Sequence, residues 1–180
     1  MESFLHFKNG KFKIMQITDT QEIHRVNPDT VKLISLALDR EKPDLVVFTG
    51  DQIKGYSATF KGDTEQKITE TLGEIFRPVI ERKIPFTATF GNHDRDCGIS
   101  NNAQAEIYKS FPGFVSGTPR CSDDAGTFLL ELKDSNNEKS IFALYLIDSN
   151  AKDKETKAYS PVFKEQVEWY KKERDRLKTE

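Results

Sequence analysis

The sequence is poor in cysteine and contains no long apolar run. Its two cysteines, Cys97 and Cys121, are too few for a disulfide framework and too far apart for a zinc knuckle. The longest uninterrupted apolar stretch, residues 141–147, is far shorter than the ~20 residues that a membrane-spanning helix needs. The first residues also lack the basic and then apolar pattern of a signal peptide. We therefore expect a cytoplasmic protein without membrane contacts.

Neither sign of charge dominates. The chain has 27 Lys and Arg against 29 Asp and Glu, a formal net charge of −2. This balance argues against a dedicated nucleic-acid-binding protein, which normally carries a basic surface. With 180 residues, 36% of them hydrophobic, the chain has the size and composition of one folded domain, and we predict a single domain over residues 1–180.

The first half of the sequence alternates between strand and helix patterns. Apolar segments typical of strands cover residues 12–18, 44–50 and 85–90, and helical patterns cover residues 28–42 and 64–83. Asn27 before Pro28 is a typical helix start, and Pro78 is expected either to kink the second helix or to mark its last turns. Strands joined by helical crossovers of this length form right-handed βαβ units, so we predict an α/β fold with a parallel sheet.

The second half has a different pattern. A short helix is predicted over residues 102–111, and two strands over residues 126–132 and 140–147 flank a polar hairpin loop. Pro161 is expected to open a last helix, whose apolar stripe would consist of Phe163, Val167, Tyr170 and Leu177.

Polar segments follow all three predicted parallel strands. They are Asp19-Thr20-Gln21, Gly50-Asp51-Gln52 and Gly91-Asn92-His93-Asp94. The carboxyl ends of parallel strands meet at one edge of a sheet, where sites of α/β proteins form. We therefore expect carboxylates, an amide oxygen and an imidazole in one pocket, and oxygen-rich sets of this kind suit hard divalent cations.

Gly50-Asp51 and Gly91-Asn92-His93-Asp94, each after an apolar strand, resemble motifs of the calcineurin-like metallophosphoesterase superfamily. The residues around Asp19 and Asp51, with Leu146-Ile147-Asp148-Ser149 and residues 166–170, are most similar to its purple-acid-phosphatase-like branch. The resemblance covers essentially the whole chain. It implies a β-sandwich with flanking helices, here without the C-terminal part of the second sheet.

The resemblance also implies a reaction and a role for each matching residue. Phosphomonoesters or phosphodiesters would be hydrolysed by a hydroxide activated by two divalent metal ions, which could be Mn, Mg, Fe or Zn. Asp19 would bind the first metal, Asp51 would bridge both, and Asn92 would bind the second. His93 would face the substrate phosphate, and Asp94 would orient His93.

Two departures from the family pattern matter. The first motif of the family is Asp-any-His, and here Gln21 stands at the third position. Gln21 could coordinate through its amide oxygen or lie outside the ligand set, and His24 could substitute for it. The family also supplies later histidines and a closing Gly-His-any-His motif, whereas this chain has only His6, His24 and His93. We therefore expect the N-terminal half to two-thirds of the family domain, with a surface open to self-association.

Two other functions remain open at this stage. In the first, the chain is a non-catalytic fragment that binds a metal, a phosphate-like ligand or a protein partner. In the second, it is an aspartyl-phosphate phosphatase that uses Asp19 as the nucleophile. That class places a second aspartate where Gln21 stands, and it leaves the Gly-Asn-His-Asp segment without a role.

Overall fold

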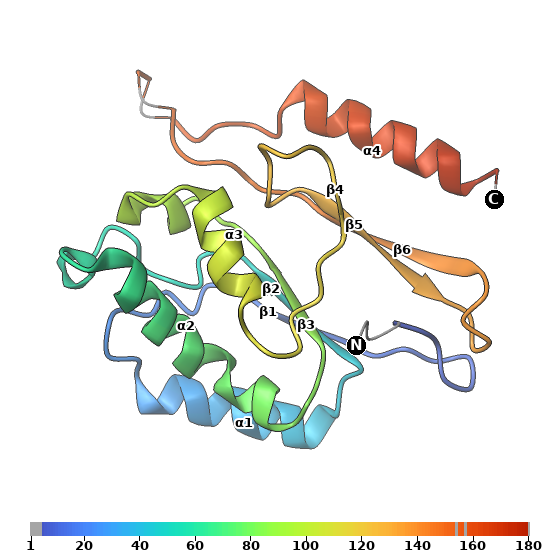
Figure 1. Cartoon of the computed structure of the whole chain (residues 1–180), viewed down its shortest axis with the longest axis horizontal. Helices are drawn as coiled ribbons and strands as arrows, with labels where there is room; N and C mark the ends of the chain where they lie inside the picture. Colours follow the sequence, from blue (N-terminus) through green and yellow to red (C-terminus); the bar gives the residue numbers. More distant parts are fainter. Residues whose placement is uncertain (1–4, 154, 157, 180) are drawn as a thin grey trace.

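Two three-stranded sheets lie at the centre of the computed structural model, which describes residues 5–153, 155–156 and 158–179 (Figure 1). The first sheet is parallel, in the order β1 (Ile14–Ile17), β2 (Leu45–Thr49), β3 (Phe86–Thr89). The second is antiparallel and consists of β4 (Thr118–Pro119), β5 (Phe128–Lys133) and β6 (Ser140–Leu146). The three parallel strands and the β5–β6 hairpin confirm the sequence prediction. The two-residue strand β4 is not among the predicted strands.

In the described part of the chain, four α-helices connect and cover the sheets: α1 (Pro28–Glu41), α2 (Thr64–Glu81), α3 (Asn101–Lys109) and α4 (Lys164–Leu177). Helix α1 begins as predicted, because Asn27 Oδ1 accepts a hydrogen bond from Asp29 N at 3.0 Å and Pro28 is the first helical residue. Helix α2 continues through Pro78 to its last turn. None of the helices in the described ranges is both long enough and apolar enough to cross a membrane.

Strand β2 shows why the first sheet is buried on both faces. Val46 and Phe48 face the helices and pack in a core with Phe76, whereas Leu45 and Val47 pack in a second core against the other sheet. Successive side chains of a strand point to opposite faces, so a continuous apolar run is expected where both faces are covered. Figure 1 shows the resulting layers: α1 and α2 on one side of the first sheet, β5 and β6 on the other, and α4 beyond them. The predicted α/β sandwich is confirmed.

The predicted apolar stripe of the last helix is wrong at its N-terminal end. Phe163 lies just outside α4 and is 45% exposed, and Val167 is 39% exposed. The residue that α4 buries there is Gln166, which is 1% exposed. Farther along the helix, the rings of Trp169 and Tyr170 pack edge-on against Tyr145 of β6, with ring centroids 5.9 and 4.8 Å apart. Helix α4 therefore docks through a polar anchor and aromatic contacts.

Candidate functional site

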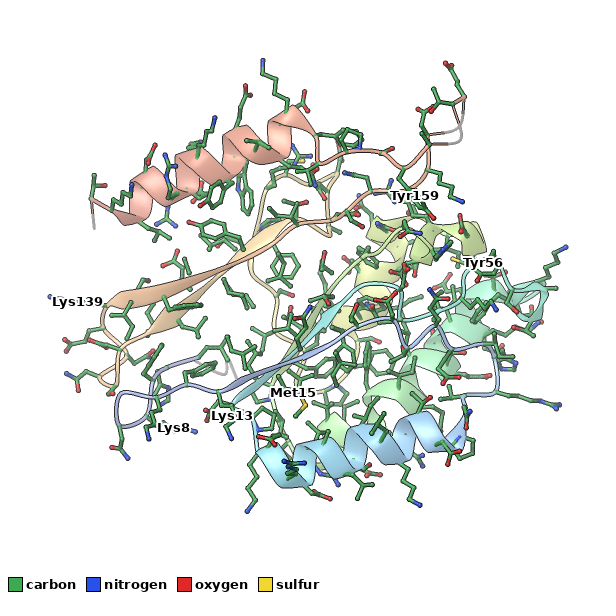
Figure 2. The ribbon with its side chains drawn as sticks, turned by 180° about the vertical axis from the view of Figure 1, so that it is seen from behind. Lys8, Lys13, Met15, Tyr56, Lys139 and Tyr159 are labelled. Atoms are coloured by element: carbon green, nitrogen blue, oxygen red, sulfur yellow. The ribbon has the colours of Figure 1, made fainter. Side chains whose placement is uncertain are left out.

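The three polar segments lie at the same edge of the first sheet. β1, β2 and β3 run parallel and in register, so their carboxyl ends stand side by side. Lys13 directly precedes β1, and Tyr56 lies in the loop after β2. In Figure 2, these two residues lie on opposite sides of the middle of the molecule. The predicted convergence of the three strand ends is therefore present in the structure.

Backbone hydrogen bonds extend the β1–β2 pairing beyond the strands and into the two loops that follow. Asp19 N donates to Gly50 O at 3.1 Å, and Gln21 N donates to Asp51 O at 2.9 Å. A third bond, from Glu22 N to the next carbonyl of the β2 loop, is 3.1 Å long. The segment with Asp19 and Gln21 is therefore held against the segment with Asp51.

Three of the predicted ligand residues have left-handed backbone conformations. The φ angles are +53° for Asp19, +41° for Gln21 and +51° for Asp51. This region costs an L-residue about 1–2 kcal/mol, although aspartate and asparagine adopt it more readily than glutamine does. Such strain persists where the surroundings enforce it, and it concentrates at functional sites. The conformation is independent support for treating these loops as one site.

Asp94 is fully buried and holds the loops after β2 and β3 together. Its Oδ2 atom accepts hydrogen bonds from Asp51 N and Gly91 N, both at 2.8 Å, and its Oδ1 atom accepts one from Ile53 N at 3.4 Å. Burial raises the pKa of Asp94 to about 7, with a further contribution from the nearby Asp51 carboxylate, while the backbone hydrogen bonds oppose the shift. Asp94 is thus a structural centre of the site.

The imidazole of His93 is oriented by Asp96 and not by Asp94. His93 Nδ1 lies 2.8 Å from Asp96 Oδ2, and His93 N donates to Asp51 Oδ1 at 2.8 Å. The prediction that Asp94 orients His93 is wrong in this respect, because the Asp94 oxygens are engaged by backbone N–H groups. The sequence carried a usable signal: Asp96 lies three residues after His93, and residues at this spacing align in a 3₁₀ turn such as Asp94–Cys97.

The other predicted ligands keep polar atoms available. Asp19 is exposed and accepts a hydrogen bond from Thr18 Oγ1 at 2.5 Å. Gln21 and Asn92 are half-buried, and within the described ranges neither side chain makes a hydrogen bond. His24 instead lies beside α2, where its Nε2 atom is 2.8 Å from Glu70 Oε2.

No three His, Cys, Asp or Glu side chains of the described residues come together as a metal-binding group. A divalent cation at this edge would therefore also need the amide oxygens of Gln21 and Asn92, or donors from outside the described residues. The nearby thiol of Cys97 is a poor candidate for chemistry, because burial raises its pKa and its Sγ atom donates to Asp94 O at 3.1 Å.

A buried carboxylate just after β6 supports the segment that carries His93. Asp148 is 1% exposed, and its Oδ2 atom accepts hydrogen bonds from Arg95 at 3.0 Å and from Asn101 at 2.7 Å. Burial raises the pKa of Asp148, while Asn150 N, Arg95 and Asn101 oppose the shift. These contacts give Asp148 a structural role.

Comparison with known proteins identifies the family. A family model described as calcineurin-like phosphoesterase matches residues 12–179, which include all three polar segments. The chain belongs to the calcineurin-like phosphoesterase family. This confirms the resemblance that the strand-end motifs carry.

Individual relatives extend this picture. Phosphatase DCR2 of Saccharomyces cerevisiae is 31% identical over 162 residues, covering 78% of this chain and 27% of the yeast protein. Probable inactive purple acid phosphatase 29 of Arabidopsis thaliana is 27% identical over 188 residues, covering 98% of this chain and 46% of the plant protein. The chain thus spans less than half the length of either relative.

A solved structure shares the fold. The crystal structure of a dimetal phosphatase from Danio rerio aligns with 89% of this chain and 50% of its own, at 16% sequence identity and a TM-score of 0.55. At this level of identity, the likeness supports the fold and does not assign an activity.

Proposed function

We propose that the carboxyl edge of the first sheet is a phosphoesterase site that acts on a phosphomonoester or a phosphodiester. The observation that carries this proposal is the set of hydrogen bonds that joins Asp51, His93 and Asp94 across two loops. These bonds give the Gly-Asn-His-Asp segment a fixed geometry next to a carboxylate. Membership of the phosphoesterase family supports the same reaction class.

The oxygen donors at this edge fit a hard divalent cation. Asp51 Oδ1 is engaged by His93 N, whereas Asp51 Oδ2 accepts no hydrogen bond from the described residues, although Asp51 is only 6% exposed. With Asp19, Gln21 and Asn92, the set contains two carboxylates and two amides, which suit Mg or Mn better than Fe or Zn. Two cations per site would need donors beyond these four residues.

Divalent cations bound here would neutralise charge on the phosphoryl oxygens and acidify a water molecule. The protein's own contribution is positional. Asp94 holds the two loops, and His93 faces the substrate with its Nε2 atom, which makes no hydrogen bond within the described ranges. In this position, His93 would stabilise phosphoryl charge or protonate the leaving oxygen.

The second candidate function is a non-catalytic fold that binds a cation, a phosphate-like ligand or a protein partner. The small number of potential nitrogen ligands favours it, because the chain contains only three histidines and two of them lie outside the site. One relative agrees with this interpretation, since the Arabidopsis protein is named as a probable inactive purple acid phosphatase. The two functions differ in turnover and share the same binding residues.

Hydrolysis of p-nitrophenyl phosphate and of bis-p-nitrophenyl phosphate, measured with added Mn²⁺, tests the proposal. We expect turnover that falls roughly 10²–10⁴-fold in His93→Gln, the usual loss on removing a general acid. His6→Gln is the matched control and should retain full activity, because His6 pairs with Lys133 at the far end of the second sheet. Cation binding without turnover of either ester would support the non-catalytic alternative.

A further inference from the structure

The ring of His93 is held from one of its two nitrogen atoms. Nδ1 lies 2.8 Å from Asp96 Oδ2, and the Asp96 backbone N–H donates to His93 O at 3.1 Å, so the two residues are joined twice. An ionised carboxylate can only accept hydrogen bonds, so the hydrogen in the side-chain contact belongs to Nδ1. In a neutral imidazole, this leaves Nε2 without a hydrogen.

Tyr56 restrains the same ring from the β2 loop. Its ring packs edge-on against the imidazole of His93, with centroids 4.8 Å apart and an interplanar angle of 62°. The preceding residue, Gly55, lies so close to the His93 carbonyl that an added Cβ would be 2.1 Å from that oxygen. This close packing of Gly55 against His93 fixes the backbone before Tyr56. On the other side of Gly55, Lys54 Nζ lies 5.2 Å from the centroid of the Tyr56 ring. The contact is therefore built into the loop.

No other described side chain takes this role. The carboxylate of Asp94 is engaged by three backbone N–H groups, and Asp51 contacts His93 through the backbone N–H and not through the ring. Among the described residues, Asp96 is thus the polar partner of the His93 ring, and Tyr56 is its aromatic neighbour.

We propose that Asp96 is the positioning residue of this site, and that with Tyr56 it holds His93 in the Nδ1–H tautomer and directs Nε2 toward the substrate phosphate. This inference rests on the proposed function for the role of Nε2. The tautomer itself is a property of the chain alone and can be measured without substrate or metal. Carboxylate–imidazole contacts of this kind set the tautomer and orientation of a histidine.

Nitrogen NMR of the histidine rings in the ¹⁵N-labelled chain, at about pH 9 where an unperturbed imidazole is neutral, tests the proposal. We expect the Nδ1–H form for His93. We expect the opposite form, Nε2–H, for His24, because its Nε2 atom is the one that lies 2.8 Å from a carboxylate, that of Glu70. The two histidines give opposite patterns in one sample, and His93→Gln and His24→Gln assign the signals.

Asp96→Ala should convert His93 largely to the Nε2–H form and leave His24 unchanged. Glu70→Ala is the matched control, because it removes the corresponding partner of His24 and should leave the His93 signals in place. Asp96→Glu, which keeps a carboxylate, should restore part of the Nδ1–H form. An Nε2–H form of His93 in the unmodified chain, or a His93 pattern that Asp96→Ala does not change, would overturn the proposal.

Activity separates this inference from the proposed function. With Mn²⁺ and p-nitrophenyl phosphate, Asp96→Ala should lower kcat roughly 10–100-fold and change KM little. A chain that shows the Nδ1–H form but no turnover would contradict the proposed function and still support the positioning by Asp96. A chain that shows turnover while His93 is in the Nε2–H form would support the proposed function and contradict the positioning by Asp96.

Discussion

The backbone N–H of Asp51 donates a hydrogen bond of 2.8 Å to Oδ2 of Asp94, across 43 residues of sequence. The same oxygen accepts from Gly91 N, so one buried carboxylate fixes the loops after two neighbouring strands. The left-handed backbone of Asp51 is held at this point. The arrangement of the site therefore depends on a residue that need not touch a substrate.

Asp94→Asn should lower the free energy of unfolding by about 1–3 kcal/mol, because an asparagine supplies one acceptor oxygen where three backbone N–H groups now share two. Urea denaturation measures the change. Asp123→Asn, at an exposed position, is the matched control and should remain within about 0.5 kcal/mol of the parent. Equal stability of Asp94→Asn and the parent would show that the buried carboxylate does not hold the loops.

Gly91→Ala should disturb Asp51 directly. A Cβ at position 91 would lie 2.2 Å from Asp51 Oδ1 and 2.6 Å from Asp51 N, so the loop must shift. Overpacking of this kind costs about 1–3 kcal/mol, and the displaced carboxylate should also weaken Mn²⁺ binding. Thermal denaturation and Mn²⁺ titration of the same sample measure both effects.

Gly73→Ala provides the comparison. Gly73 lies within α2, and a Cβ there would meet only Phe111 Cε1, at an ordinary 3.6 Å. Replacing a helical glycine by alanine at an unstrained position should raise stability by roughly 0.5–1 kcal/mol. If Gly91→Ala raised stability as Gly73→Ala is expected to do, the close packing inferred at Gly91 would be wrong.

Gln166 should matter more to the docking of α4 than the apolar Val167 beside it. Gln166 Nε2 donates to Thr127 Oγ1 at 2.8 Å and to Asp148 O at 3.0 Å, and its Oε1 atom accepts from Asn150 Nδ2 and Phe163 N. Gln166→Leu leaves these buried groups without partners and should cost about 1–3 kcal/mol. Val167→Ala, at a position that is 39% exposed, should cost less than about 0.5 kcal/mol. Urea denaturation measures both losses of stability. A larger loss in Val167→Ala than in Gln166→Leu would contradict this expectation and support the apolar stripe predicted from the sequence.

Asp148 predicts a specific pH dependence of stability. Burial raises its pKa in the folded state, so the folded protein holds this proton more tightly than the unfolded chain does. Its contribution therefore favours folding at low pH and is lost as pH rises from near 4 through the raised pKa. When the free energy of unfolding is plotted against pH, Asp148→Asn should lack this part of the slope.

Arg95→Gln extends this test. Loss of the guanidinium opposite Asp148 should raise the pKa of the carboxyl further and widen the pH range over which stability falls. If the free energy of unfolding changed with pH in the same way in the parent, Asp148→Asn and Arg95→Gln, the raised pKa of Asp148 would be contradicted.

The sequence predicted those parts of the fold that local chemistry determines. The apolar run of β2 and the Asn27-Pro28 helix start have unambiguous patterns, and the structure confirms both. The convergence of Asp51 and His93 followed from parallel strands alone. Strand β4 was not predicted, because it contains two residues, one of them a proline, and exists through its pairing with β5.

The errors have a common physical origin. Helix α4 buries Gln166 because its side chain forms hydrogen bonds with Thr127 Oγ1, Asp148 O and Asn150 Nδ2. The sequence of the helix does not reveal these partners. Likewise, Asp94 and Asp96 are both near His93 in sequence, and only tertiary packing decides which carboxylate is buried. Periodicity and motifs cannot reveal contacts that depend on where a loop is packed.

Calorimetry of Mn²⁺ binding to the parent chain and to Asp51→Asn shows whether the carboxyl edge of the first sheet holds a cation. Asparagine tolerates the left-handed conformation at this position and can still accept the His93 N–H, so the fold should be retained. We expect binding to the parent, affinity reduced roughly 10–100-fold or more in Asp51→Asn, and no change in Asp123→Asn. Equal affinity of the parent and Asp51→Asn would contradict a cation site at the carboxyl edge of the first sheet.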